Sequence, residues 1–201
     1  MFKLITLLLL LLSIAFTANL HGQDISSAAA APLRAKLPGL AVKTNLLYDA
    51  TTTFNLGGEF RLSDYLTLDV PVSYNPWTFP ENRKFKHFLV QPELRYWLNE
   101  PFNGHFLGAH LLYSHFNIGN LPFGSLRDNR YQGDAYGLGF SYGYQWLLSS
   151  RWNLEATLGL GYVYLDYSRY ECRACGRKTG EGPTNYFGAT KAGISLIYII
   201  K

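Results

Sequence analysis

Residues 152–164 alternate strictly between apolar and polar side chains, and this pattern most constrains the fold. The even positions carry Trp, Leu, Ala, Leu, Leu, Tyr and Tyr, whereas the odd positions carry Asn, Glu, Thr, Gly, Gly and Val. A period of two predicts a β-strand with one apolar and one polar face. Because aromatic residues stand at both ends of the apolar face, the pattern favours a strand that crosses a lipid bilayer.

The same alternation recurs in seven other segments, so the sequence predicts an all-β fold, an eight-stranded antiparallel up-and-down transmembrane β-barrel. The expected strands are residues 40–48, 55–62, 66–74, 88–96, 105–113, 135–146, 152–164 and 186–198. The connections 62–66, 97–104 and 147–151 are short, whereas 75–87, 114–134 and 165–185 are long. Short periplasmic turns and long external loops are typical of outer-membrane barrels. Pro71 and Pro92 lack a ladder donor, which predicts local bulges.

All charged residues of these strands fall on the polar face. They are Lys43, Glu59, Arg61, Asp69, Glu93, Arg95, Glu155 and Lys191. The interior of an eight-stranded barrel has room for side chains but not for a wide channel. We therefore expect these charges to pair inside the barrel and to close its lumen, because an unpaired buried charge is costly. A narrow pore or a proton path is the alternative.

Aromatic residues form two expected belts, as in membrane barrels. The periplasmic belt is Phe60, Tyr96, Trp146, Trp152 and Tyr198, and the outer belt is Tyr48, Tyr74, Phe88, Tyr113, Tyr136, Tyr164 and Tyr186. A soluble barrel around a lipophilic ligand is the alternative architecture. It would need the apolar faces inside and would fill its interior with Tyr and Trp, so the belts favour the membrane barrel.

The N-terminal segment is expected to direct export. Lys3 precedes an apolar stretch over residues 4–16, which predicts a signal peptide over residues 1–22. Residues 23–39 are rich in Ala, Ser and Pro and predict a flexible periplasmic lead-in, followed by the barrel over residues 40–201. The expected location is the cell outer membrane. The net charge of +4 comes from scattered cations, so we expect no nucleic-acid partner.

The loop over residues 75–87 combines aromatic and cationic side chains, which suits it to bind a partner. The candidate residues are Trp77, Phe79, Arg83, Lys84 and Phe85. Such a mixture can contact a glycan, a lipid headgroup or another protein. The alternative is a loop that folds over the barrel mouth or anchors at the headgroups.

Cys172 and Cys175 lie in the last external loop, where an exported protein meets an oxidising medium. A local disulfide, two free thiols, or a metal site completed by His87 and His115 are the alternatives. We expect no metal, because only two cysteines are present.

An outer-membrane enzyme that acts on lipid would need a nucleophile, a base and an acid together at the outer rim. His115, Asp166 and Ser168 are the candidates there, but no catalytic motif joins them. We therefore expect no catalytic residues and no cofactor.

Several stretches resemble a known family. They are Lys-Thr-Asn-Leu-Leu-Tyr-Asp at 43–49, Asn-Pro-Trp-Thr-Phe at 75–79, residues 86–97, Tyr-Gly-Tyr-Gln-Trp at 142–146, Arg-Trp-Asn-Leu-Glu at 151–155, the 172–176 loop and residues 185–196. The chain is similar to an uncharacterised (domain of unknown function) family of small outer-membrane β-barrel proteins from Bacteroidota. The resemblance implies an outer-membrane location and an association with fimbriae or adhesins, and it brings no catalytic residues. The expected function is a non-enzymatic barrel in outer-membrane lipid, whose loops bind a surface protein such as a fimbrial component, or a glycan.

Overall fold

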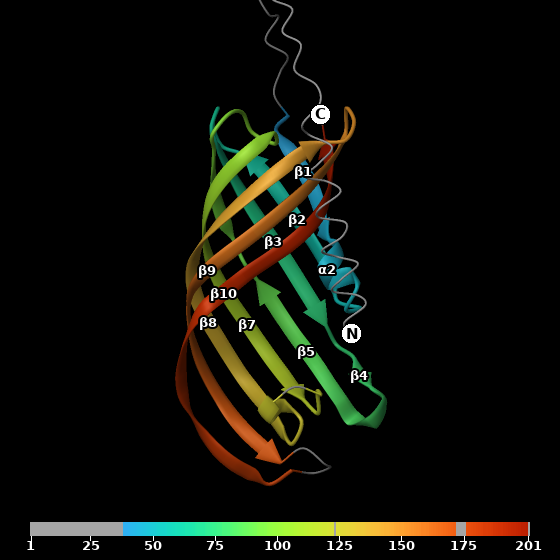
Figure 1. The fold of residues 1–201 in the computed structure, drawn as a ribbon, viewed down its shortest axis with the longest axis vertical. Coiled ribbons are helices and arrows are strands. Elements are labelled where there is room, and N and C mark those ends of the chain that lie inside the picture. Colours follow the sequence, from blue (N-terminus) through green and yellow to red (C-terminus); the bar gives the residue numbers. More distant parts are fainter. Residues whose placement is uncertain (1–37, 123, 172–175, 201) are drawn as a thin grey trace, which may run out of the picture. The chain divides into compact units, whose positions relative to one another are not determined.

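The structure, a computed structural model, describes residues 38–122, 124–171 and 176–200, and most of these lie in β-strands (Figure 1). The strands are β1 (Leu40–Asn45), β2 (Phe54–Arg61), β3 (Leu66–Asn75), β4 (Thr78–Phe79), β5 (Arg83–Val90), β6 (Glu93–Trp97), β7 (Gly104–Gly119), β8 (Asn129–Leu147), β9 (Trp152–Glu171) and β10 (Lys178–Ile200). The helical segments are α2 (Leu46–Asp49) and two 3-10 turns, Pro80–Asn82 and Gly124–Leu126. No described helix is long and apolar enough to cross a membrane. The expected signal peptide and nearly all of the expected lead-in lie outside the described residues.

The strands form a closed antiparallel ring, so the predicted eight-stranded up-and-down barrel is confirmed. Consecutive strands pair along the ring, and β10 pairs with β1 to close it. β5 and β6 count as one wall strand, because both lie between β3 and β7. Pro92 divides them, since it has no N–H to donate. The carbonyl of Pro92 still accepts a bond of 3.0 Å from Leu111 N, so the wall stays continuous.

The predicted bulges at Pro71 and Pro92 are wrong, because the pairing register does not shift at either residue. Pro92 interrupts its strand, but Pro71 remains inside β3, opposite Gly57. A register shift lies instead in β10, between Ala189 and Lys191. This shift reverses the expected face of the residues beyond it. Tyr186 pairs with Val163, whose side chain is buried in the lumen, so Tyr186 does not belong to the outer aromatic belt as predicted.

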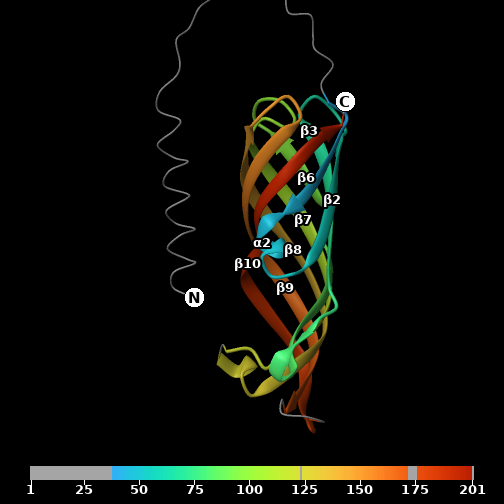
Figure 2. The ribbon, with the colours of Figure 1, turned by 90° about the vertical axis from the view of Figure 1, so that its right-hand side faces the viewer.

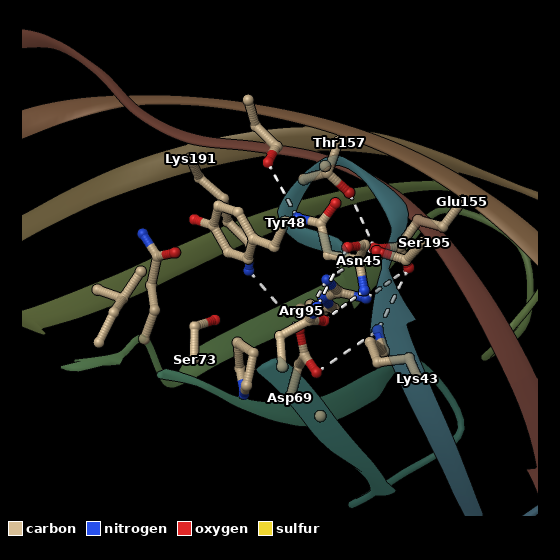
Figure 3. A pocket seen from close by; sticks show the side chains of 17 residues that line it. Lys43, Asn45, Tyr48, Asp69, Ser73, Arg95, Glu155, Thr157, Lys191 and Ser195 are labelled. Carbon is tan, nitrogen blue, oxygen red and sulfur yellow. Dashed lines mark hydrogen bonds and ion pairs between the residues drawn. The ribbon is translucent and has the colours of Figure 1, made fainter. Parts of the chain in front are cut away.

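The first predicted strand, residues 40–48, is too long. β1 ends at Asn45, whose side chain accepts a hydrogen bond of 3.1 Å from Leu47 N and so caps α2. The helix carries Tyr48 to the wall of a cavity in the lumen, where Lys43 also lies (Figure 3). Tyr48 was therefore wrongly assigned to the outer belt.

The long external loops are mostly strands. β7 and β8 pair as far as Gly119 and Arg130, and β9 and β10 pair as far as Tyr170 and Lys178. The segment 75–87 likewise forms a hairpin, because β4 pairs with β5. These hairpins continue past α2, well beyond the part of the wall that β1 closes (Figures 1 and 2).

Candidate functional site: the charged lumen and the outer groove

The centre of the lumen holds an ion cluster organised around Arg95 on β6. The guanidinium lies 2.9 Å from Glu59 and 2.9 Å from Asp69. It also lies 2.6 Å from Glu93 and 2.7 Å from Glu155, and its exposed fraction is 1%. A planar guanidinium has donors on several sides, which suits it to bind several carboxylates at once. Arg95 therefore joins β2, β3, β6 and β9 across the barrel.

Two lysines complete the cluster from the strands on either side of the closing seam. Lys43 on β1 places its ammonium 2.5 Å from Glu59 and 3.4 Å from Glu155. Lys191 on β10 lies 3.0 Å from Glu93. Four carboxylates thus face three permanent cations. His110 on β7 contributes an imidazole 3.5 Å from Glu93.

The structure brings together seven of the eight charges that the sequence places on the polar face. Arg61 is the exception. It lies at the end of β2, and the described residues offer it no ion pair. The sequence places Arg61 on the correct face but does not show which side chains it contacts: it lies opposite Thr67, as Arg95 does, and forms no ion pair among the described residues.

Neighbouring hydroxyls and glycines support the cluster. The Thr67 hydroxyl donates a hydrogen bond of 2.6 Å to Glu59, and the Thr157 hydroxyl donates one of 2.9 Å to Glu155. The Ser141 hydroxyl donates a hydrogen bond of 2.8 Å to Glu93. Gly108 gives Glu93 its space, since a Cβ there would lie 2.7 Å from the carboxyl carbon. The cluster is thus held by hydrogen bonds as well as by charge, as a buried charge requires.

Buried apolar side chains form a layer inside the barrel at the end where β1 begins. Trp97 and Phe102 lie with their ring centroids 6.1 Å apart, and Phe106 lies 4.9 Å from Trp97. Ile197 and Ile199 of β10 are buried in the same region. The sequence placed Trp97 in a turn, yet it shares the inward parity of Glu93 and Arg95. The arginine lies 4.3 Å over the ring of Phe106, so the two layers are in contact.

On the other side of the ion cluster, the lumen contains a cavity of about 40 Å³ (Figure 3). Asn45, Tyr48, Ser73, Gln91 and Ser195 line it together with members of the cluster. Such a volume holds a few water molecules and no larger ligand. The arrangement can therefore bind water and keep charges paired.

The two layers lead to a prediction about conductance. Reconstituted into a planar bilayer, the chain is expected to show no steady open channel. Phe106→Ala, which thins the apolar layer alone, should also stay closed, because the ion cluster remains in place. Single-channel recording of both proteins checks this. Large, stable conductance steps in the unsubstituted chain would favour the narrow-pore alternative instead.

At the end of the barrel that carries the hairpins, a groove of about 510 Å³ lies between the turn before β2 and the segment around β4. Trp77 and Phe79, two of the residues predicted to bind a partner, line it together with Phe54, Thr52 and Pro80. The ring centroids of Phe54 and Trp77 lie 5.7 Å apart, and the indole N–H donates a hydrogen bond of 2.9 Å to the carbonyl of Thr52. Sequence reasoning missed Phe54, because the short connection before it gave no sign that it meets the 75–87 hairpin.

The other residues proposed for this loop do not line the groove. Arg83, Lys84 and Phe85 lie on β5, and Arg83 and Lys84 pair with Phe79 and Thr78 of β4. The partner-binding set therefore divides into an aromatic groove and a basic strand next to it.

The remaining candidates from the sequence do not come together. Cys172 and Cys175 lie outside the described residues. Within the described part, no three His, Cys, Asp or Glu side chains are grouped to hold a metal. His115 lies 3.0 Å from Asp134 on β8, and Asp166 lies opposite Asp134 on β9, so Asp134 stands between the two candidates. Ser168 lies opposite Gln132 on β8, and the described chain has no hydrogen bond between Ser168 and His115.

Comparison with known proteins gives one family. A family described as "Protein of unknown function (DUF3575)" matches residues 7–200, which is nearly the whole chain. A search of curated proteins finds no match.

Proposed function

Because the chain belongs to the DUF3575 family of proteins of unknown function, we propose its function from its own geometry. It is a non-enzymatic barrel that spans the outer membrane with a closed lumen. Its outer hairpins and groove bind a component of the cell surface, a protein such as a fimbrial subunit or a glycan. The membrane lipid is its other partner.

The inverted distribution of side chains carries the membrane part of this proposal. The outer faces of the strands expose large apolar residues, including Leu56, Leu107, Leu111, Leu138, Phe140, Leu158 and Leu160. The same strands turn their charges inward, where Arg95 and Glu59 are fully buried. A soluble protein rarely exposes an apolar surface that continues around its circumference. In a bilayer, that surface is covered by lipid.

Aromatic pairs at both ends of the apolar wall support the same proposal. Trp152 and Tyr198 lie 5.0 Å apart at the end where β1 begins. Tyr113 and Tyr136 lie 5.3 Å apart towards the hairpins. Tyrosine and tryptophan favour the level of the headgroups, where one end of the ring is apolar and the other is hydrated.

The groove supports the binding part of the proposal. It presents the exposed rings of Phe54 and Trp77 on a wall that the strands hold rigid. Aromatic side chains in such a position contribute most of the binding energy of many interfaces. Since the lumen is closed, the outer surface is where this chain can meet a ligand.

The binding function is tested by replacing Trp77 and Phe79 with alanine in the full chain. Capture of the surface partner in whole cells, by crosslinking from the hairpins, is expected to fall about tenfold or more, since one binding aromatic is worth about 2 kcal/mol. Tyr65→Ala is the matched control, because Tyr65 is an exposed aromatic of the turn before β3, towards the opposite end. Both proteins should keep the heat-modifiable migration of a folded barrel.

Two results would contradict the binding function. Equal capture by the Trp77 and Phe79 double variant and the Tyr65 control would remove the groove from the interaction. A lipid-modifying activity that His115→Ala abolishes, with capture unchanged, would favour the enzyme alternative.

A further inference from the structure

The outer part of β10 has a neighbour on one side only. β9 pairs with β10 along almost its whole length, whereas β1 pairs with it only from Ile200 to Ser195. Beyond that point the described chain supplies no second strand, because α2 replaces β1. Figure 1 shows β10 continuing past α2 to the far end of the hairpins. Among the described residues, the outer part of β10 therefore presents a free sheet edge.

Side chains fill the inner end of this edge and a proline limits its outer end. The Asn45 side chain donates a hydrogen bond of 3.2 Å to the carbonyl of Ala192 and accepts one of 3.3 Å from Ile194 N. The Gln91 side chain donates a hydrogen bond of 2.9 Å to the carbonyl of Thr190. Pro183 has no N–H to offer a new strand. Residues 184–189 remain between these limits and span about 20 Å; we call them the edge window.

The edge window has the properties of a surface that another strand covers. Residues 183–187 are all exposed, and Phe187, at 79%, is the most exposed large apolar side chain among the described residues. The window contains no charge, although charged residues normally protect a sheet edge. Asn185 pairs with Tyr164 of the outer belt, so backbone groups here lie close to lipid, which cannot satisfy them.

We propose that the edge window binds an extended strand of another protein, which continues the sheet beyond β10. This mode, β-strand addition, obtains affinity from main-chain hydrogen bonds and specificity from alternate side chains. The matching segment is an uncharged stretch of about six residues without proline, with β-branched or aromatic side chains that pack on Phe187. The inference deepens the proposed function, on which it rests, by naming the chemistry of the partner.

A second copy of this chain does not fit the edge. Two copies inserted in the same direction are related by an axis along the membrane normal. Barrel strands tilt by about 35–45° from that normal, so the two β10 edges would cross at about 70–90°. Paired strands must run nearly parallel or antiparallel, with only a small twist. A segment of a different protein is free to take the required orientation.

The test uses a synthetic peptide of alternating threonine and valine with blocked ends and a lysine at each terminus. The matched control is the same peptide N-methylated at alternate residues, which removes the N–H groups of one edge. The full chain in detergent micelles is expected to bind the first peptide saturably and the control at least tenfold more weakly. Hydrogen exchange should slow in residues 184–189 when the first peptide is added.

Two variants locate the binding. Phe187→Lys, which places a charge in the edge window, should weaken the binding of the first peptide at least tenfold. Thr179→Lys is the control, because Thr179 lies at a register shift near the end of the hairpin and outside the window. Equal binding of both peptides, or no slowing of exchange in the window, would overturn the inference. If, without any peptide, hydrogen exchange in residues 184–189 becomes slower as the protein concentration rises, a second copy of the chain pairs there. That result would also overturn the inference.

This outcome is separable from that of the proposed function. If the barrel inserts and captures its partner through the groove but binds neither peptide, the inference on β10 alone fails. If the chain does not behave as a membrane barrel, the proposed function fails whatever the peptides do.

Discussion

Replacing Arg95 by methionine is expected to reduce the free energy of unfolding by at least about 3–5 kcal/mol, the usual consequence of breaking a buried ion pair. Arg95 contacts all four carboxylates of the cluster, so the variant leaves four buried anions with only Lys43 and Lys191. Urea unfolding of the detergent-solubilised chain, followed by tryptophan fluorescence, measures the loss.

Arg61→Met is the matched control for this experiment. It makes the same chemical change on the inward face of β2, but Arg61 has no ion pair among the described residues. Its unfolding midpoint should stay close to that of the unsubstituted chain. Adding Glu155→Gln to Arg95→Met should restore part of the stability, since one unpaired anion disappears. Equal midpoints for Arg95→Met and Arg61→Met would show that the ion cluster does not hold the barrel together.

The second large effect concerns the outside of the wall. The unsubstituted chain is expected in the outer-membrane fraction, with different migration before and after boiling. Phe140→Arg should strongly reduce the folded band, because Phe140 is 73% exposed midway along the wall, opposite Ala109 and Leu160. An arginine at mid-depth in a bilayer costs about 2–4 kcal/mol.

Phe54→Arg provides the comparison, since it makes the same substitution at an exposed position near the outer belt. Phe54 is 62% exposed and pairs with Tyr74 at the end of the wall. The cost there should be only about 0–1 kcal/mol. A soluble barrel would tolerate both arginines equally and would remain in the periplasmic fraction, a result that would refute the membrane proposal.

The sequence predicts the ring of strands well, because side-chain alternation is local. Lys43, Glu59, Asp69 and Glu155 each stand among apolar neighbours at the period of a strand, so their face follows from parity alone. Which charges meet does not follow from parity. Arg61 and Arg95 both lie opposite Thr67 of β3, yet among the described residues only Arg95 forms ion pairs.

The other errors have separate causes, some local and some remote in sequence. The end of β1 could have been anticipated, since Asn45 is a good N-cap residue for a helix. Tyr186 could not, because the register shift near Thr190 depends on contacts from Gln91 and His110, which are remote in sequence. The hairpins were taken for loops because apolar alternation fades where strands leave the apolar wall. Backbone pairing in β7–β10 continues without it.

The seam between β1 and β10 also constrains the order in which this barrel can form. Leu40 pairs with Ile200, so the ring closes only when β1 meets β10, which follows it by about 155 residues. Lys43 is the only charged residue on β1, and it reaches Glu59 and Glu155. In a sheet that has not yet closed, β1 can already pair with β2 and bring Lys43 to Glu59, whereas Glu155 on β9 lacks this cation. Closing the ring therefore completes the charge pairing of its interior, because it brings Lys43 to Glu155. Because so distant a contact is slow to form, that step is expected to limit the rate of folding.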